Sequence, residues 1–169
     1  MNDKSLYLLA QFDKETQEIL TGYYAILQQN GFIGNQTKSI PYHFTLGKKD
    51  IDCEKQLVGY LDKLCENTAC IDIRLSHIAL FGLSILFIAP DMNLELLTLR
   101  QKFFPDCGNG AYTWTAHATL LIDEPEEILK ALPIVANNFK PFNARIESLG
   151  LYEFFPKRFI KEYSLNSEL

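Results

Sequence analysis

The stretches PYHFTLG (41–47) and TAHATLL (115–121) share the phrase His-x-Thr-Leu, and the rest of the sequence is best interpreted around them. The 169-residue chain has three histidines, and two of them, His43 and His117, stand in this phrase. The two copies lie almost half a chain apart, each in a stretch whose residues favour a β-strand. This repetition indicates two equivalent strands that build one site.

The elements around the two motifs are predicted to follow the same order in both halves of the chain. Hydrophobic spacing and cap residues predict a strand, a helix, the motif strand, a second helix and a second strand, twice over. We expect Gly47 to end the first motif strand and Pro133 to kink or end the last helix. The predicted ranges are 5–12, 13–30, 41–47, 53–66 and 70–81, then 84–90, 93–104, 111–122, 124–139 and 142–154, with a last strand at 159–165 and loops at 31–41 and 105–110.

This order of elements predicts an α+β fold with two pseudo-symmetric lobes. Each lobe is expected to have an antiparallel sheet with helices outside, and the lobes are expected to enclose a central cleft. We expect residues 1–169 to form a single bilobal domain, with motif-bearing halves at roughly 1–82 and 83–169. An approximate two-fold axis would then bring the two motif strands face to face.

Composition narrows the class of protein. With 47% hydrophobic and 22% charged residues, the chain is typical of a globular domain, and its net charge of −5 argues against a surface that grips extended nucleic acid. We see no membrane span and no signal peptide, and the spacing of the cysteines (Cys53, Cys65, Cys70 and Cys107) favours reduced thiols over a zinc site. We therefore expect a cytoplasmic monomer.

The motif strands are expected to present one polar and one apolar face. Side chains alternate between the faces of a strand, so the histidine and the threonine of each motif share a face. In the second strand Thr113, Thr115, His117 and Thr119 would form a polar stripe, which is costly to bury without partners. We expect this stripe to line a wet cleft.

Two imidazoles and two hydroxyls around one cleft suit phosphodiester chemistry. A neutral histidine can accept a proton from the attacking oxygen, and a protonated one can donate to the leaving oxygen, because the ordinary pKa of histidine lies near neutrality. Threonine hydroxyls can donate hydrogen bonds to the non-bridging phosphate oxygens. No carboxylate accompanies either histidine on its strand face, so we expect no metal and no cofactor.

These paired motifs, HFTL (43–46) and HATL (117–120), resemble those of the two-histidine (2H) phosphoesterase superfamily, also called 2′-5′ RNA ligase-like. The stretches RLSHIALFG and RIESLGLYEF also look like the strand that follows each motif in this family. The resemblance implies that His43 and His117 form the catalytic acid/base pair. It also implies that Thr45 and Thr119 bind the substrate phosphate.

The resemblance implies a metal-independent cyclic phosphodiesterase, or an enzyme that processes 2′,5′-phosphodiesters and RNA ends. The expected ligand is a small cyclic nucleotide or an RNA terminus. Two alternatives stay open: a module that binds a nucleotide or RNA end with little turnover, and a structural or interaction protein. The acidic Asp123 and Glu124 that follow the second motif depart from many family members, which place a basic or ligand-binding residue there.

Other residues are weaker candidates. Lys48 follows the first motif and could bring a cation to the phosphate, although a solvated lysine is the simpler interpretation, and Thr115 continues the polar stripe. Tyr152 and Phe155 stand near a strand end and could border the cleft, where aromatic rings stack on bases.

Three further side chains are interpreted as core residues. His77 shares the alternation of Ile71, Ile73 and Leu75, so we expect it to be buried and bonded to backbone. Tyr42 and Trp114 alternate away from the motif histidines, and we expect both to pack in the core rather than on a base.

Overall fold

The computed structural model describes residues 4–104 and 114–168, so the expected loop at 105–110 and residues 111–113 of the expected strand lie outside the described residues. The described residues form an α+β fold, as predicted. In chain order the elements are β1 (Ser5–Phe12), α1 (Lys14–Gln29), β2 (His43–Asp50), a short 3-10 turn (Ile51–Cys53), α2 (Glu54–Glu66), β3 (Ile71–Phe81), β4 (Ile85–Pro90), α3 (Leu94–Phe103), β5 (Ala118–Ile122), α4 (Pro125–Asn138), β6 (Phe142–Phe154) and β7 (Arg158–Ser164).

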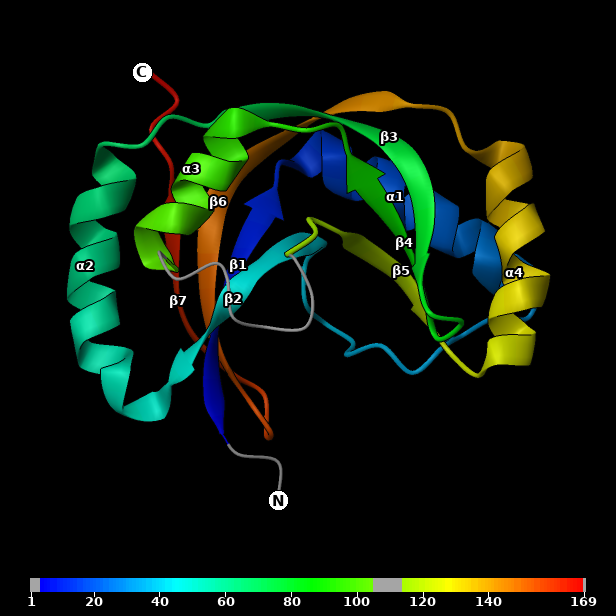
Figure 1. Ribbon diagram of the computed structural model, residues 1–169, viewed down its shortest axis with the longest axis horizontal. Helices are drawn as coiled ribbons and strands as arrows, with labels where there is room; N and C mark the ends of the chain where they lie inside the picture. Colours follow the sequence, from blue (N-terminus) through cyan, green and yellow to red (C-terminus); the bar gives the residue numbers. More distant parts are fainter. Residues whose placement is uncertain (1–3, 105–113, 169) are drawn as a thin grey trace.

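The strands form one antiparallel sheet in the order β2-β1-β6-β3-β4-β5, with β7 paired to β6 (Figure 1). We expected a separate sheet in each lobe, and the structure has a single sheet because β6 is long enough to serve both parts. Phe142–Ile146 pairs with β3, and Ile146–Phe154 pairs with β1. The two motif strands, β2 and β5, are the two edges of this sheet.

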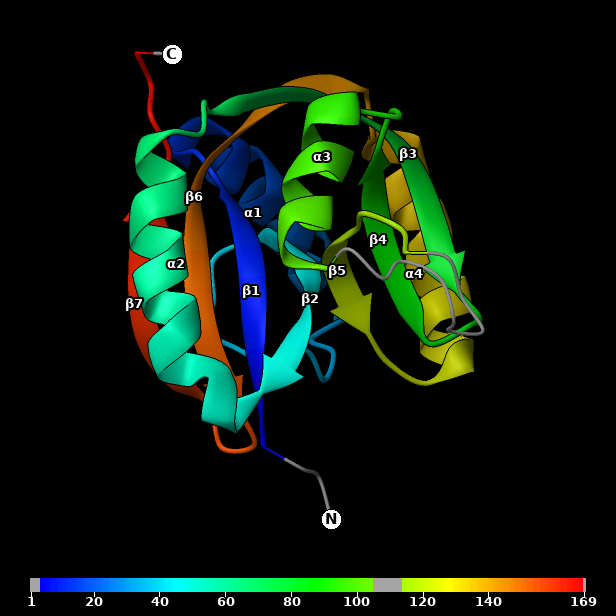
Figure 2. The ribbon, with the colours of Figure 1, turned by 60° about the vertical axis from the view of Figure 1, so that its left-hand side comes forward.

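The helices cover the outer face of the curved sheet in two pairs (Figures 1 and 2). Helices α1 and α4 contact each other, and they pack on the part of the sheet that holds β4 and β5. Helix α2 contacts β7 and, through the rings of Tyr60 and Phe103, also contacts α3. Each pair therefore combines one helix from each half of the chain. None of the described helices is long and apolar enough to cross a membrane.

Helix α1 shows how local sequence sets the boundaries of an element. The Asp13 side chain accepts a hydrogen bond from the Thr16 amide at 3.0 Å, which satisfies a backbone donor that has no partner within the helix. At the other end Gly31 has a φ of +90°, a conformation that glycine adopts without a steric penalty. The predicted helix at 13–30 is confirmed.

Strand β2 and helix α4 each continue past a residue that could have ended them. Strand β2 continues past Gly47, where a bulge at Leu46 interrupts its register with β1, and a Cβ at Gly47 would come within 2.7 Å of the Phe104 ring. The glycine therefore permits close packing instead of ending the strand. Helix α4 does not end at Pro133 but continues to Asn138, in agreement with the predicted range 124–139, and a kink at Pro133 stays a prediction. The carbonyl that loses its partner belongs to Leu129, whose residue is 52% exposed, so solvent can reach this part of the helix.

The prediction that His77 is a core residue is wrong. Leu75 pairs with Pro90 and His77 pairs with Ala89, so Ser76 is an extra residue in β3 and turns His77 to the opposite face. The side chain of His77 is 62% exposed, and its Nδ1 lies 2.7 Å from the Ser76 hydroxyl. Strand alternation predicts the wrong face here because a one-residue bulge inverts it.

Candidate active site

The two motif strands come together although they lie at opposite edges of the sheet. The sheet curls until β2 and β5 are in contact, as they are near the centre of Figure 1. One direct link is the indole Nε1 of Trp114, which donates a hydrogen bond to the Thr45 carbonyl at 2.9 Å. The Arg100 guanidinium of α3 stacks over the Trp114 ring at 4.9 Å and donates from Nε to the Leu46 carbonyl. These contacts hold the two edges at a fixed separation.

Both motifs show the expected alternation of burial. In β2, Phe44 and Leu46 are 0% exposed among the core side chains, whereas His43 and Thr45 are half-buried on the other face. At β5, Ala118 and Leu120 are buried, and His117 and Thr119 are half-buried. The strand at the second motif is shorter than predicted, since β5 begins at Ala118, and the segment Trp114–His117 leads into it without strand pairing.

The two imidazoles are held in the same way. Nδ1 of His43 lies 2.7 Å from the Pro41 carbonyl, and Nδ1 of His117 lies 2.8 Å from the Thr115 carbonyl, so each ring binds the backbone two residues earlier. A carbonyl oxygen only accepts, so Nδ1 carries the proton in both rings. Each Nε2 is therefore the atom that can accept or donate a proton at a ligand.

The surroundings of both histidines favour the neutral imidazole. Burial lowers the pKa of His43 below its ordinary value, and the nearby positive charge of a protonated His117 lowers it further, while the bond to Pro41 opposes the shift. Burial also lowers the pKa of His117, against its bond to Thr115. The effect of a protonated His117 on His43 indicates that the pair resists holding two protons at once.

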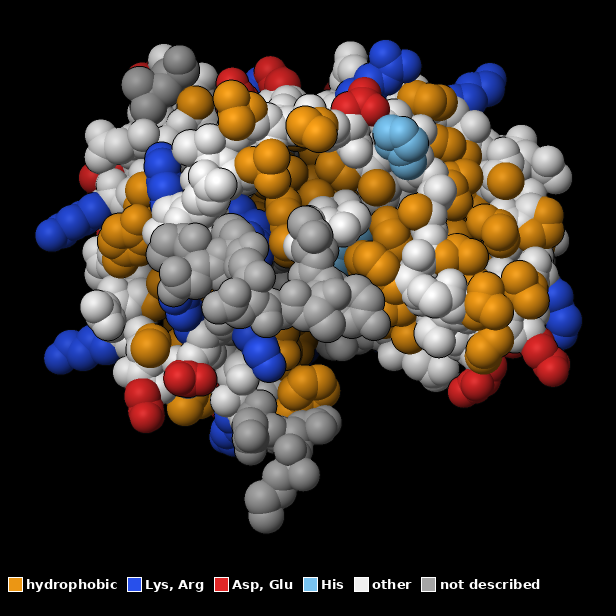
Figure 3. All heavy atoms as spheres, in the orientation of Figure 1, with side chains coloured by type: hydrophobic (Ala, Val, Ile, Leu, Met, Phe, Trp, Pro, Cys, Tyr) orange, Lys and Arg blue, Asp and Glu red, His pale blue; other side chains and the backbone are white. Residues whose placement is uncertain are grey.

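His117 has an aromatic wall that His43 lacks among the described residues. The Phe81 ring meets the His117 imidazole edge-on with centroids 4.8 Å apart, and Phe87 lies at 5.4 Å. In Figure 3 hydrophobic side chains gather over the part of the molecule that β3, β4 and α4 form. Phe81 and Leu83, at the turn between β3 and β4, are among the exposed apolar residues. The second motif thus sits against an apolar surface.

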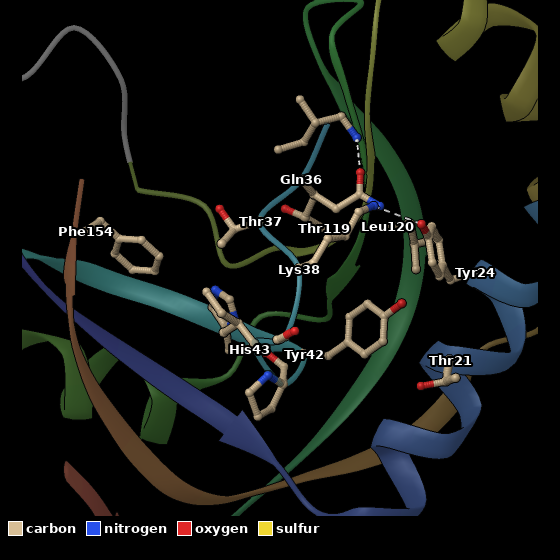
Figure 4. Close-up of a pocket in the computed structure, with 14 residues that line it drawn as sticks. Thr21, Tyr24, Gln36, Thr37, Lys38, Tyr42, His43, Thr119, Leu120 and Phe154 are labelled. Atoms are coloured by element: carbon tan, nitrogen blue, oxygen red, sulfur yellow. Dashed lines mark hydrogen bonds between the residues drawn. The ribbon is translucent and has the colours of Figure 1, made fainter. Parts of the chain in front are cut away.

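A cavity of about 370 Å³ joins the motifs to the loop that precedes β2 (Figure 4). This volume lies within the range of small-molecule sites, about 300–1,000 Å³. Both motif strands contribute, through His43 and Thr119. Of the described residues that line the cavity, none is Asp or Glu. The lining comprises Thr21, Tyr24, Gln36, Thr37, Lys38, Ser39, Ile40, Pro41, Tyr42, His43, Thr119, Leu120, Ile122 and Phe154.

Only part of the predicted set lines this cavity: His117 and Thr45 are not among its lining residues, and the weaker candidates are also divided. Lys48 and Thr115 are exposed outside the lining, although the Thr115 carbonyl holds His117. Phe155 is 55% exposed in the turn after β6, and its neighbour Phe154 lines the cavity instead. Tyr42 and Trp114 are partly buried against the core, as expected, and Tyr42 also borders the cavity.

Tyr152 lies on the same sheet face as the first motif but is not among the residues that line the cavity. It is 6% exposed, and its hydroxyl lies 3.5 Å from the Gln11 amide nitrogen. Gln11 pairs with His43 on the neighbouring strand, so their side chains share a face. A Cβ at Gly150 would lie 2.7 Å from Gln11 Nε2, so a larger residue there would require the Gln11 side chain to shift. The sequence did not reveal the contact between Gln11 and Tyr152, because this contact depends on strand register.

The loop before β2 supplies most of the cavity lining that sequence reasoning missed. Its backbone attaches to β5, since the Asn35 amide donates to the Ile122 carbonyl at 2.6 Å and the Ile122 amide donates to Gln36 Oε1 at 3.2 Å. Gly34, with a φ of +69°, leaves space for Gln36 and Leu121 at this contact. The position of this loop directly before a motif suggested a role in ligand binding, but its residue types did not identify a ligand.

Comparison with known proteins identifies the fold. No protein-family model matches the chain, and no curated protein matches it. Among solved structures, apo LigT of E. coli aligns over 98% of this chain and all of its own, with a TM-score of 0.63 and 16% identity. TT0787 of Thermus thermophilus aligns over 98% and 100%, with a TM-score of 0.64 and 14% identity. LigT complexed with ATP gives a TM-score of 0.64 at 18% identity, over 97% of this chain and 98% of LigT.

The chain therefore has the fold of the 2H phosphoesterase, or 2′-5′ RNA ligase-like, superfamily. The fold that the two motifs implied is confirmed over nearly the full length of the chain.

Proposed function

We propose that this protein is a metal-independent phosphodiesterase that uses its two His-x-Thr motifs to open 2′,3′-cyclic phosphates or to process 2′,5′-linked RNA ends. The observation that carries this proposal is the matched pair of imidazoles. Each has Nδ1 bonded to a backbone carbonyl and Nε2 available, at the place where β2 and β5 meet. A binding site has no need for two proton-transfer groups held in the same tautomer.

In the proposed reaction water attacks the phosphorus of the cyclic phosphate. One neutral imidazole, that of His43 or His117, takes a proton from the water at Nε2 as the new phosphorus–oxygen bond forms. The other, protonated imidazole gives its Nε2 proton to the ribose oxygen as the old phosphorus–oxygen bond breaks. The product is a phosphomonoester with a free ribose hydroxyl, and the two histidines exchange protonation states.

The hydroxyls of Thr45 and Thr119 are proposed to donate hydrogen bonds to the non-bridging phosphate oxygens. Each threonine lies two residues after its histidine on the same strand face, so proton transfer and charge stabilisation act on one phosphate. A bound phosphate anion favours imidazolium, which offsets the effect of burial on the pKa of the histidine that acts as the acid.

Two further observations support a nucleotide ligand. LigT, which shares the fold, has been crystallised in complex with 3′-AMP and with ATP. The cavity next to His43 lacks carboxylates among its described lining residues, as suits an anionic ligand in a chain whose net charge is −5.

The proposal is tested by hydrolysis of the four nucleoside 2′,3′-cyclic monophosphates in the presence of EDTA. We expect turnover by the wild type and a loss of about a thousandfold in kcat/KM in His43→Ala and in His117→Ala. His77→Ala is the matched control, since the exposed His77 belongs to neither His-x-Thr motif, and it should retain full activity.

The outcomes separate the alternatives. Turnover that survives the loss of either motif histidine would refute acid/base catalysis by the pair. A wild type that binds these nucleotides without turnover would be a binding module with the same fold.

A further inference from the structure

One part of the cavity has a chemistry of its own. There the loop before β2 faces helix α1, and Figure 4 shows the Lys38 amino group and the hydroxyls of Tyr24 and Tyr42 directed toward one another. Thr21 lines the same end from α1. The groups that converge here are an ammonium and three hydroxyls, and the described lining contains no carboxylate to neutralise them.

Part of this hydrogen-bonding capacity is already used to hold the loop. The Tyr24 hydroxyl donates to the Ile33 carbonyl at 2.7 Å, and Lys38 Nζ donates to the same carbonyl at 2.9 Å and to the Tyr24 hydroxyl at 3.0 Å. Lys157 Nζ fixes the loop from the other side, through the carbonyls of Lys38 and Ser39. The position of the ammonium group is therefore set before any ligand arrives.

Other donors at this end have no partner among residues 4–104 and 114–168. An ammonium group has three N–H bonds, and Lys38 uses two of them in the contacts above. No hydrogen bond from the side-chain hydroxyl of Tyr42 or of Thr21 occurs within the described residues. Burial, with a further effect from Tyr24, raises the pKa of Tyr42 well above its ordinary value, so its hydroxyl keeps its proton and is a donor.

A preorganised cluster of donors around a lysine, with no carboxylate, is complementary to a phosphate group. In the proposed function the scissile phosphate lies between the motif strands, so this cluster is left for a second phosphate. In an RNA end that carries a 2′,3′-cyclic phosphate, the next phosphate is the one on the 5′ oxygen of the same nucleotide.

We infer that Lys38, Tyr42 and Thr21 bind the 5′-phosphate of the terminal nucleotide, so that the enzyme prefers 5′-phosphorylated nucleotides and RNA ends to bare nucleoside cyclic phosphates. This inference rests on the proposed function, because it assigns the scissile phosphate to the two motifs. It names the substrate class that the motifs alone leave open.

The test compares uridine 2′,3′-cyclic phosphate with its 5′-phosphorylated form. We expect the wild type to show a kcat/KM about tenfold higher for the 5′-phosphorylated substrate, the size of one charge-assisted contact. Lys38→Gln and Tyr42→Phe should each bring this ratio to within about twofold of one. Tyr42→Phe is the cleaner variant, since it removes a hydroxyl that holds nothing in the described structure.

Lys63→Gln and Tyr60→Phe on helix α2 are the matched controls, and both should keep the wild-type ratio. A wild-type ratio near one would overturn the inference while leaving the proposed function intact. A ratio that stays at the wild-type level in both Lys38→Gln and Tyr42→Phe would overturn the assigned residues.

Failure of both substrates to react would instead refute the proposed hydrolysis of nucleoside 2′,3′-cyclic phosphates. The subsite would then be judged by calorimetry, from whether the wild type binds adenosine 3′,5′-bisphosphate more tightly than adenosine 3′-monophosphate. Equal affinities would overturn the inference in that case too.

Discussion

The strands β2 and β5 carry the same four-residue motif but lie in different surroundings. His43 is the first residue of β2, which pairs with β1, and it faces a cavity whose described lining includes hydroxyls and one lysine. His117 stands before the start of β5, and its ring packs against Phe81 and Phe87. The bond from Nδ1 to the carbonyl two residues earlier is common to both.

This comparison teaches which features of the motif are local and which come from its surroundings. The tautomer of each imidazole is set by the chain segment that carries it, because the carbonyl partner is two residues earlier. The proton affinity of each is set by neighbours from other elements, and these differ between the two motifs. Two equivalent sequences can therefore supply an acid and a base with different pKa values.

The largest expected effect concerns the equivalence of the two histidines. If they act as one unit, the double variant His43→Ala/His117→Ala should lose little more activity than either single variant, each of which loses about a thousandfold. Single-turnover hydrolysis of a cyclic nucleotide measures this. Losses that multiply in the double variant would show that the two motifs act independently.

The threonines give the next largest effect. Thr45→Val and Thr119→Val should each lower kcat about a hundredfold, because each removes a donor to the charged transition state, with a smaller change in KM. Thr98→Val on helix α3 is the control, since its hydroxyl binds only the Leu94 carbonyl in the described structure. Equal losses would support two equivalent motifs, whereas a change in KM alone would assign one threonine to ground-state binding.

The pH dependence of kcat/KM tests how the surroundings of His43 and His117 affect their pKa values. Burial makes imidazolium less stable than imidazole, so both histidines lose their protons at a lower pH than an exposed histidine. The bell-shaped profile of kcat/KM should therefore centre below about pH 6.5, the ordinary pKa of histidine.

Phe81→Ala exposes His117 to water and should move one limb of this profile toward higher pH. Leu83→Ala, on the same turn, should leave both limbs in place. A wild-type profile that centres above pH 6.5 would contradict the lowered histidine pKa values. A profile that does not shift in Phe81→Ala would show that Phe81 does not lower the pKa of His117.

The smallest expected effect concerns the hydrogen bond between Trp114 and Thr45, which links the segment before β5 to β2. Trp114→Phe keeps most of the apolar ring but loses the bond to the Thr45 carbonyl, so we expect the free energy of unfolding in urea to fall by about 1 kcal/mol. Activity should fall only a few-fold. An unchanged stability would show that other contacts hold β2 and β5 together.

Much of the candidate site could be predicted from the sequence because alternation along a strand is a local property. The polar face of His43 and Thr45 and the buried face of Phe44 and Leu46 followed from spacing alone. The same reasoning misplaced His77, because the bulge at Ser76 depends on how β3 pairs with β4. The division of the chain into motif-bearing halves at 1–82 and 83–169 stays a prediction.

The sequence by itself determined the two His-x-Thr pairs, the face that each presents and most of the helices and strands around them. Only the tertiary structure decided that the motifs lie at the two edges of one sheet and that the loop before β2 lines the cavity with Lys38 and Tyr42. The physical reason is the range of the interactions. Periodicity is set by neighbours along the chain, whereas the curl of a sheet and the anchoring of a loop come from contacts between distant residues.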